Sequence, residues 1–386
     1  MPNMIYFDMD LHTAQPQNTT QLVPDEIISE IVQLQNKLTS SKVPVELKEE
    51  TMRSVNRLRR MAKWGNYSSE FETVYKYVDW VTRIPWGQIT EDNLDIQNAR
   101  KIMDSTHYGM DTVKNLILDY LSVMQLKKIR TNRDPSYVQK EENVNSPVLL
   151  FVGLQGVGKT SIAQSIATSM GRQFARISLG AIGDVRTLRG VPRYEIDSEP
   201  GQIAKALIRT QSMNPVILID EIEKASVNKG LLNDVMAVLL EILDPEQNSN
   251  FIDHYIDYPI DLSKVFFICT ANNLGGLSTA LLDRLEVIRF TSYNDEDKKV
   301  IATKYILPVA LSKMGLNKEY VEISEEVWPL IIRPVGFDAG IRQLERNIYT
   351  LLRSVAREII EGKPVPIVIT PENLKEYVLP DQGPLS

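Results

Sequence analysis

Residues 153–160 of this chain have the types and the spacing of a phosphate-binding loop. They read Gly-Leu-Gln-Gly-Val-Gly-Lys-Thr and fit the pattern G-x-x-x-x-G-K-[ST]. Glycines let the backbone approach phosphate oxygens, which its N–H groups bind together with the positive end of a following helix. Lys159 can reach the β and γ phosphates, and the Thr160 hydroxyl can hold Mg²⁺. The alternative is a chance match in an ordinary loop, which the apolar run 148–152 just before it disfavours.

A second chemical signal is the pair of carboxylates Asp220 and Glu221, which ends the apolar run 216–219. Phosphoryl transfer requires a metal-binding carboxylate and a residue that positions the attacking water near the γ phosphate. Asp220 would hold Mg²⁺, and Glu221 would polarise the water. The alternative is an ordinary strand end before an acidic helix start. The phosphate-binding loop upstream favours the metal site.

Three further polar residues could act on the same phosphates, although each also has an ordinary structural explanation. Asn272 follows the apolar run 265–270 and could orient water, or it could belong to an Asn-Asn turn. Arg284 could reach the nucleotide of a neighbouring subunit, or it could pair with a nearby acidic residue. Arg342 opens a helix and could contact the nucleotide from the other side, or it could pair with Glu345 or Glu358. The residues alone leave these alternatives open.

The elements that must position these residues form a parallel α/β sheet. Short apolar runs alternate with helical stretches, which is typical of a sheet covered by helices on both faces. The expected strands are 148–152, 174–179, 216–219, 265–270 and 286–290. Asp220 and Asn272 would then lie at the carboxyl ends of strands, where such sheets bind ligands.

Helical spacing dominates the rest of the chain. Helices are expected over about 25–38, 45–61, 71–84, 95–104 and 109–128, then from 293 to about 361, with a short strand at 367–369. These patterns predict a loose tail (1–23), a helical N-terminal region (24–130), a linker (131–146), an α/β domain (147–292) and a small helical domain (293–386).

Composition and charge argue against several other classes of protein. The chain has 386 residues, of which 43% are hydrophobic, enough for two or three domains. Its net charge of −7 disfavours nucleic-acid binding. The single cysteine, Cys269, permits no disulfide framework, and three dispersed histidines form no zinc pattern. With no membrane-length apolar run and no secretory signal, we predict a cytoplasmic protein, or a mitochondrial matrix protein in a eukaryote.

Longer stretches of the sequence resemble the AAA+ ATPase module of the Lon protease family. The resemblance extends from about residue 24 to 378. It depends on motifs more specific than the phosphate-binding loop, among them Ile84-Pro-Trp-Gly87, Leu218-Ile-Asp-Glu-Ile-Glu-Lys224 and Leu239-Leu-Glu-Ile-Leu-Asp-Pro-Glu-Gln-Asn248. It implies a P-loop α/β domain with a helical lid domain, ATP and Mg²⁺ as cofactors, and a homo-hexameric ring that acts on protein substrates.

The resemblance also implies a role for each candidate residue. The nucleotide-binding loop would include Gly153, Gly156, Gly158, Lys159, Thr160 and Ser161, and Thr160 and Asp220 would hold Mg²⁺. Glu221 is similar to the catalytic glutamate, Asn272 and Arg342 to the two sensor residues, and Arg284 to the arginine finger. His107, Tyr108 and Tyr293 fall where the family packs the adenine. Because an arginine finger acts on the nucleotide of a neighbouring copy, this assignment implies a ring.

Two departures from the family pattern affect the expected function. The serine–lysine peptidase domain of the family has no counterpart in this sequence, so we expect either a natural relative without it or the ATPase portion of a full Lon protease. In the substrate-gripping loop, Glu195 takes the place of the family's aromatic residue, Tyr194 comes one position earlier, and Asp197 and Glu199 add acid. Either Tyr194 and Ile196 take over the contact with substrate, or translocation is altered.

These observations predict a Lon-like ATPase that binds, unfolds or remodels protein without cutting it, with or without a separate peptidase as partner. One alternative is the ATPase portion of a full ATP-dependent Lon serine protease. Another, from a different class, is an ATP-gated assembly or scaffold ring in which the loop docks a partner. A DNA-loading role is disfavoured by the acidic chain.

Overall fold

The computed structural model describes residues 25–62, 68–133, 147–181, 185–226, 232–333 and 340–378. They form two compact units, which divide between Thr82 and Arg83. This division falls inside the helical region predicted for 24–130, because the last two helices of that region share a core with the sheet of the second unit. The tail predicted for 1–23 and most of the predicted linker lie outside the described residues. None of the described helices is long and apolar enough to cross a membrane.

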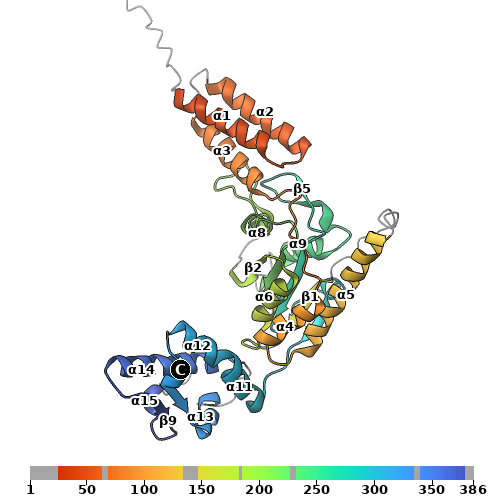
Figure 1. Cartoon of the computed structure of the whole chain (residues 1–386). Helices are drawn as coiled ribbons and strands as arrows, with labels where there is room; N and C mark the ends of the chain where they lie inside the picture. The colour runs from red at the N-terminus through yellow and green to blue at the C-terminus, as the bar shows by residue number, and fades with distance from the viewer. Residues whose placement is uncertain are drawn as a thin grey trace, which may run out of the picture. The chain divides into compact units, whose positions relative to one another are not determined.

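The first unit contains the helices α1 (Asp25–Ser40), α2 (Val45–Ala62) and α3 (Ser68–Arg83), which are red to orange in Figure 1. The side chains that hold it together recur at the helical spacing seen in the sequence. They include Ile31, Leu34 and Leu38 in α1, Leu47, Val55 and Leu58 in α2, and Val78 and Val81 in α3, all of which are buried. An ion pair of 2.6 Å between Lys37 Nζ and Asp79 Oδ1 joins α1 to α3.

The second unit is built on a five-stranded parallel sheet with the strand order β2-β3-β6-β1-β7. The strands are β1 (Leu149–Val152), β2 (Phe174–Ser178), β3 (Val216–Asp220), β6 (Phe266–Ala271) and β7 (Glu286–Arg289). Each of the five predicted apolar runs is therefore a strand, and the predicted fold class is confirmed. The strands β1, β3 and β6 are buried along their whole length, which explains why their sequences are continuously apolar rather than alternating.

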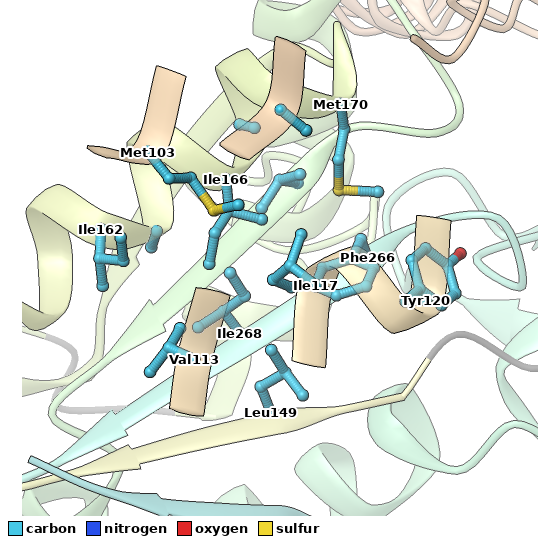
Figure 2. Close-up of a cluster of buried hydrophobic side chains, with 14 of the residues drawn as sticks. Met103, Val113, Ile117, Tyr120, Leu149, Ile162, Ile166, Met170, Phe266 and Ile268 are labelled. Carbon is cyan, nitrogen blue, oxygen red and sulfur yellow. The ribbon is translucent and has the colours of Figure 1, made fainter. Parts of the chain in front are cut away.

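Helices α4 (Ile96–Thr106), α5 (Asp111–Arg133) and α6 (Lys159–Met170) share one hydrophobic core with this sheet. Figure 2 shows Met103 of α4, Ile117 of α5 and Ile166 of α6 gathered over Leu149 of β1 and Ile268 of β6. These five side chains are fully buried. The core therefore fixes the position of α6, and with it the loop that leads into this helix. Helix α5 continues to Arg133, so the first three residues of the predicted linker are helical.

Among the described residues, four further helices lie in the segments between the later strands of the sheet. They are the helices α7 (Val185–Arg189), α8 (Gln202–Thr210), α9 (Leu232–Leu243) and α10 (Thr279–Leu282). The antiparallel strands β4 (Phe251–Ile252) and β5 (Pro259–Ile260) were not predicted, because two residues are too short to produce an apolar run.

The C-terminal part has its own core around Trp328, Ile348 and Leu351. Its helices are α11 (Asp295–Ile301), α12 (Leu307–Lys313), α13 (Trp328–Ile332), α14 (Arg342–Ile360) and α15 (Leu374–Tyr377). The predicted strand 367–369 is confirmed as β9 (Ile367–Ile369). It pairs in parallel with β8 (Val321–Ile323). The prediction of helix throughout 293–361 was wrong at β8, where three residues gain their extended conformation from this pairing rather than from a local pattern.

Candidate nucleotide-binding site

The glycine-rich loop joins the end of β1 to the start of α6. Gly156 and Gly158 have φ angles of +82° and +95°, in the left-handed region that favours glycine. A Cβ atom at Gly153 would lie 2.5 Å from the carbonyl oxygen of Phe290, and one at Gly158 would lie 2.9 Å from Met110 Cε. Space therefore requires glycine at Gly153, where the close atom belongs to the backbone, and backbone conformation favours it at Gly156 and Gly158. The loop ends at the N-terminus of α6, whose first N–H groups have no partner within the helix and can bind an anion.

A cavity of about 210 Å³ lies beside this loop and gathers residues that are far apart in the sequence. Its lining includes Lys159, Thr160, Asp220, Glu221, Asn272 and Arg342. The strands β3 and β6 supply the carboxylates and the asparagine from their carboxyl ends, as expected for an open α/β sheet. The structure thus brings these six residues together with Gly156, Gly158 and Ser161 of the predicted loop.

Lys159 lies deep in this cavity, with 9% of its surface exposed. Its Nζ donates to the carbonyl oxygens of Gly153 and Leu154, the latter at 3.2 Å, and to Asn272 Oδ1 at 3.1 Å. Burial lowers the pKa of Lys159 below the ordinary lysine value, an effect that the nearby carboxylates of Glu223 and Asp220 oppose. The ammonium group is therefore held inside the cavity by oxygen atoms on several sides.

The carboxylate of Asp220 is nearly buried and accepts hydrogen bonds on both oxygens. The Thr270 hydroxyl donates to Oδ1, and Arg176 Nε donates to Oδ2 at 2.9 Å. With the Thr160 hydroxyl in the same cavity, the available donors are hard oxygen atoms of the kind that Mg²⁺ prefers. No group of three or more His, Cys, Asp or Glu side chains that could hold a metal exists among the described residues. Two protein oxygens still fit Mg²⁺, which is usually bound by one or two side chains together with substrate phosphates.

Glu221 has a φ angle of +60°, which is rare for a residue with a side chain. Its N–H donates to Thr270 Oγ1 at 3.1 Å, and its carboxylate pairs with Lys224 Nζ at 2.7 Å. Such a conformation costs about 1–3 kcal/mol and recurs at functional sites, where the surrounding structure holds it in place. It directs the chain out of β3 while keeping Glu221 on the lining of the cavity.

Asn272 connects Lys159 to a carboxylate that the sequence analysis did not assign. Its Nδ2 and its backbone N–H donate to Glu223 Oε1, at 2.7 and 3.1 Å. Because its Oδ1 accepts from Lys159, the amide lies between a cation and an anion, and its orientation is fixed. The sequence contained one signal for Glu223, namely the second acid in the run Asp220-Glu-Ile-Glu223.

Arg342 lines the cavity from the start of α14. The residues just before it touch the glycine-rich loop directly, since Ile341 N donates to the Gly156 carbonyl oxygen at 3.0 Å. A Cβ atom at Gly340 would lie 2.6 Å from the Gln155 carbonyl oxygen. The C-terminal helices and the α/β sheet, both parts of the second unit, therefore meet at the loop.

A second cavity, of about 500 Å³, contains the residues predicted to pack an adenine. His107, Tyr108 and Tyr293 line it, and it shares Gly158 and Ser161 with the first cavity. His107 Nε2 and Ser161 Oγ lie 2.9 Å apart. Burial, and to a lesser extent the charge of Lys114, lowers the pKa of His107 to about 4. The imidazole is therefore neutral at physiological pH. The Tyr293 hydroxyl donates to the Val157 carbonyl oxygen at 3.1 Å.

Arg284 is not among the described residues that line either cavity. Its Nε donates to Asp244 Oδ2 at 3.1 Å, and its Nη1 donates to the Ala280 carbonyl oxygen at 2.8 Å. Although burial alone would raise it, the pKa of Asp244 is lowered by hydrogen bonds from the Glu246 backbone and from Arg284. The partner of Arg284 thus comes from the Leu-Asp-Pro-Glu-Gln-Asn motif and not from its acidic neighbours in sequence.

The predicted substrate loop presents two apolar side chains to solvent. Tyr194 and Ile196 are 87% and 91% exposed. Glu195, between them, forms an ion pair with Arg186 of α7. The residue at the aromatic position of the family pattern is therefore bound to the body of the domain, and its two neighbours form the exposed tip.

A glycine-rich loop, acidic residues at the carboxyl end of a central parallel strand and an adjoining helical domain define a P-loop ATPase of the AAA class. Comparison with known families agrees: residues 149–293 match the ATPase family associated with various cellular activities (AAA), and residues 312–367 match the Lon protease AAA+ ATPase lid domain. The chain belongs to the Lon family and corresponds to its AAA+ ATPase region.

Individual relatives lead to the same family. The chain is 41% identical to Lon protease 2 of Thermus thermophilus over 360 residues. The aligned region covers 93% of this chain and 44% of the relative. It is 40% identical over 354 residues to Lon protease of Dictyoglomus thermophilum, with 92% and 42% covered. The mitochondrial Lon protease homolog of Homo sapiens is 39% identical over 321 residues, with 83% and 32% covered. The chain thus spans less than half the length of these curated relatives.

Proposed function

We propose that this chain is an ATP-hydrolysing motor of the Lon type that unfolds or remodels protein substrates. One observation carries the proposal. A single cavity beside the glycine-rich loop combines a buried lysine, a hydroxyl and carboxylate pair suited to Mg²⁺, a second carboxylate, an amide and an arginine. This is the set of groups that phosphoryl transfer to water requires.

The residues would divide the work as follows. Lys159 would exchange its contacts with loop carbonyl groups for phosphate oxygens, and Thr160 and Asp220 would hold Mg²⁺. Bound Mg²⁺ supplies charge neutralisation between phosphate oxygens. Glu221 would orient the attacking water, with the amide of Asn272 beside it. Arg342 would bind the phosphates from the C-terminal domain.

The position of Arg284 supports a ring of several copies, which we propose to be the homo-hexamer implied by the family resemblance. This arginine lies outside the cavity of its own chain and pairs with Asp244. A guanidinium that stabilises charge on the transferred phosphate must touch that phosphate. A neighbouring copy would supply it, so each site would be complete only between two chains.

The exposed pair Tyr194 and Ile196 supports a polypeptide as the substrate, because aromatic and aliphatic side chains bind varied sequences through apolar contact. The relatives are named as proteases, whereas the families matched within this chain are an ATPase domain and a lid domain. We therefore propose that residues 1–386 move protein but do not cut it. Cutting would require a peptidase domain, either in a longer form of this protein or in a separate partner.

A turnover assay on the purified chain tests this function. We expect Mg²⁺-dependent release of phosphate from ATP, stimulated by an unfolded protein such as casein, with the casein left intact. Glu221→Gln should retain ATP binding and lose turnover, because the amide cannot accept the proton of the attacking water. Absence of Mg²⁺-dependent turnover at every protein concentration would contradict the proposal, and fragmentation of casein would show that the chain itself is a protease.

A further inference from the structure

Arg176 lines the nucleotide cavity but belongs to none of the motifs found in the sequence. It lies on β2, which pairs with β3 in a register that sets Ser178 opposite Asp220. Its Nε donates to Asp220 Oδ2 at 2.9 Å, and its Nη2 contacts the same oxygen. Charge-assisted contacts of this kind are about twice as strong as neutral hydrogen bonds. The pairing depends on the neighbouring strand, so it is invisible in the sequence around Asp220.

The two partners of Asp220 approach it from different sides. Thr270, which donates to Oδ1, is 1% exposed and belongs to the buried strand β6. The Arg176 side chain is 50% exposed, against 7% for the Asp220 side chain, and it lines the cavity. Both residues line the cavity, but Thr270 is held in a buried strand and the Arg176 side chain is exposed, so a ligand that reaches the carboxylate displaces Arg176 first.

The charges around the cavity explain why such a cation is needed. Glu221 pairs with Lys224, and Glu223 accepts hydrogen bonds from Asn272. Asp220 is the most deeply placed of the acidic residues that line the cavity, and a buried carboxylate without a compensating charge is costly. Arg176 supplies that charge by direct contact, and Lys159 adds a second positive charge nearby.

We propose that Arg176 is a positioning residue that holds the Asp220 carboxylate in place and competes with Mg²⁺ for it. This inference rests on the proposed function, since it assumes that Asp220 binds Mg²⁺ together with a nucleotide. Mg²⁺ that enters with a nucleotide would have to displace the guanidinium from Asp220. The Arg176 contact would therefore reduce the contribution that the metal makes to nucleotide binding.

The test compares nucleotide binding with and without the metal. Fluorescently labelled ADP is titrated into the wild-type chain and into Arg176→Gln, at saturating Mg²⁺ and in EDTA. The ratio of the two affinities measures the contribution of Mg²⁺, and any contact of Arg176 with the nucleotide that persists in both conditions cancels. We expect the ratio to be about 5–10-fold larger in Arg176→Gln, because the metal no longer displaces a charge-assisted contact.

Two further variants make the result specific. Arg176→Lys keeps the charge but loses the fork geometry, so its ratio should lie between those of the wild type and Arg176→Gln. Arg333→Gln removes an exposed ion pair with Asp295 outside the cavity, and its ratio should equal that of the wild type. If Arg176→Gln fails to fold, a larger ratio in Arg176→Lys than in the wild type supports the proposal.

An unchanged ratio in the Arg176 variants would overturn the inference, even if their ADP affinity fell, since Arg176 would then bind only the nucleotide. That result would leave the proposed function intact. Failure of the wild-type chain to bind ADP in either condition would overturn both, so the two failures are distinguishable.

Discussion

The nucleotide cavity and the proposed substrate loop differ in how exposed their side chains are and in how firmly they are held. In the cavity, Lys159 and Asp220 are 9% and 5% exposed and are held by several hydrogen bonds each. At the loop tip, Tyr194 and Ile196 project into solvent, and Glu195 between them pairs with Arg186 of the domain. Catalysis on a bound phosphate requires side chains that are already oriented. Binding of polypeptides with many different sequences requires accessible apolar surface. The contrast implies that substitutions in the cavity should be severe and substitutions at the tip graded.

The largest effect is expected for Arg284→Ala, which should lower turnover at saturating ATP by about 10³-fold, because the transition-state charge loses its arginine. Affinity for ATP should change little, since Arg284 lies outside its own cavity. Steady-state phosphate release and equilibrium binding measure the two quantities. Arg333→Ala, which removes an exposed arginine outside the cavity, serves as the control. Full activity of Arg284→Ala would place the finger elsewhere.

Lys159→Ala should weaken ATP binding by about 100-fold or more, because a phosphate would lose its charge-assisted contact in a desolvated site. Calorimetric titration of the purified variant measures this loss. Thermal unfolding in the absence of nucleotide should show that the variant is folded. An affinity equal to that of the wild type would refute the assignment of the phosphate-binding loop.

The buried imidazole of His107 should make the free energy of unfolding depend on pH. Its pKa of about 4 in the folded chain lies below the ordinary value of 6.5. Between these values the unfolded state binds more protons, so stability falls as pH falls. The loss between pH 7 and pH 5 should be about 2 kcal/mol. His107→Gln should lack this component, and urea unfolding at both pH values measures it. An equal pH dependence in the two proteins would contradict the buried, neutral imidazole.

The smallest effects are expected at the loop tip. Tyr194→Ala and Ile196→Ala should each reduce the stimulation of ATP turnover by unfolded protein by about 2–5-fold, since each removes one accessible apolar contact. The measured quantity is the ratio of stimulated to unstimulated turnover. Ile360→Ala, at an equally exposed position on α14, should leave this ratio unchanged. Full stimulation in both tip variants would favour the alternative of an assembly ring, in which the loop docks a partner.

Some features of the fold and of the site could be predicted from the sequence, and others could not. Apolar runs were sufficient to predict the five strands of the sheet, three of which are buried along their whole length. Motif spacing placed Lys159 and Asp220 at one site, and the family resemblance added Asn272. The contact between Arg176 and Asp220 could not be predicted from the sequence, because it depends on the order of strands in the sheet. The pairing of Arg284 with Asp244 likewise joins two distant segments. The left-handed backbone of Glu221 has no signature in residue type.

The hydrogen bond between Ile341 N and the Gly156 carbonyl oxygen has a mechanical consequence. Helix α14 begins one residue later and runs for 19 residues, a length of about 28 Å. A tilt of about 10° at the glycine-rich turn would displace the far end of this rod by about 5 Å. In the proposed ring, a sub-ångström rearrangement around a phosphate would thereby become a movement of several ångströms at the far end of α14.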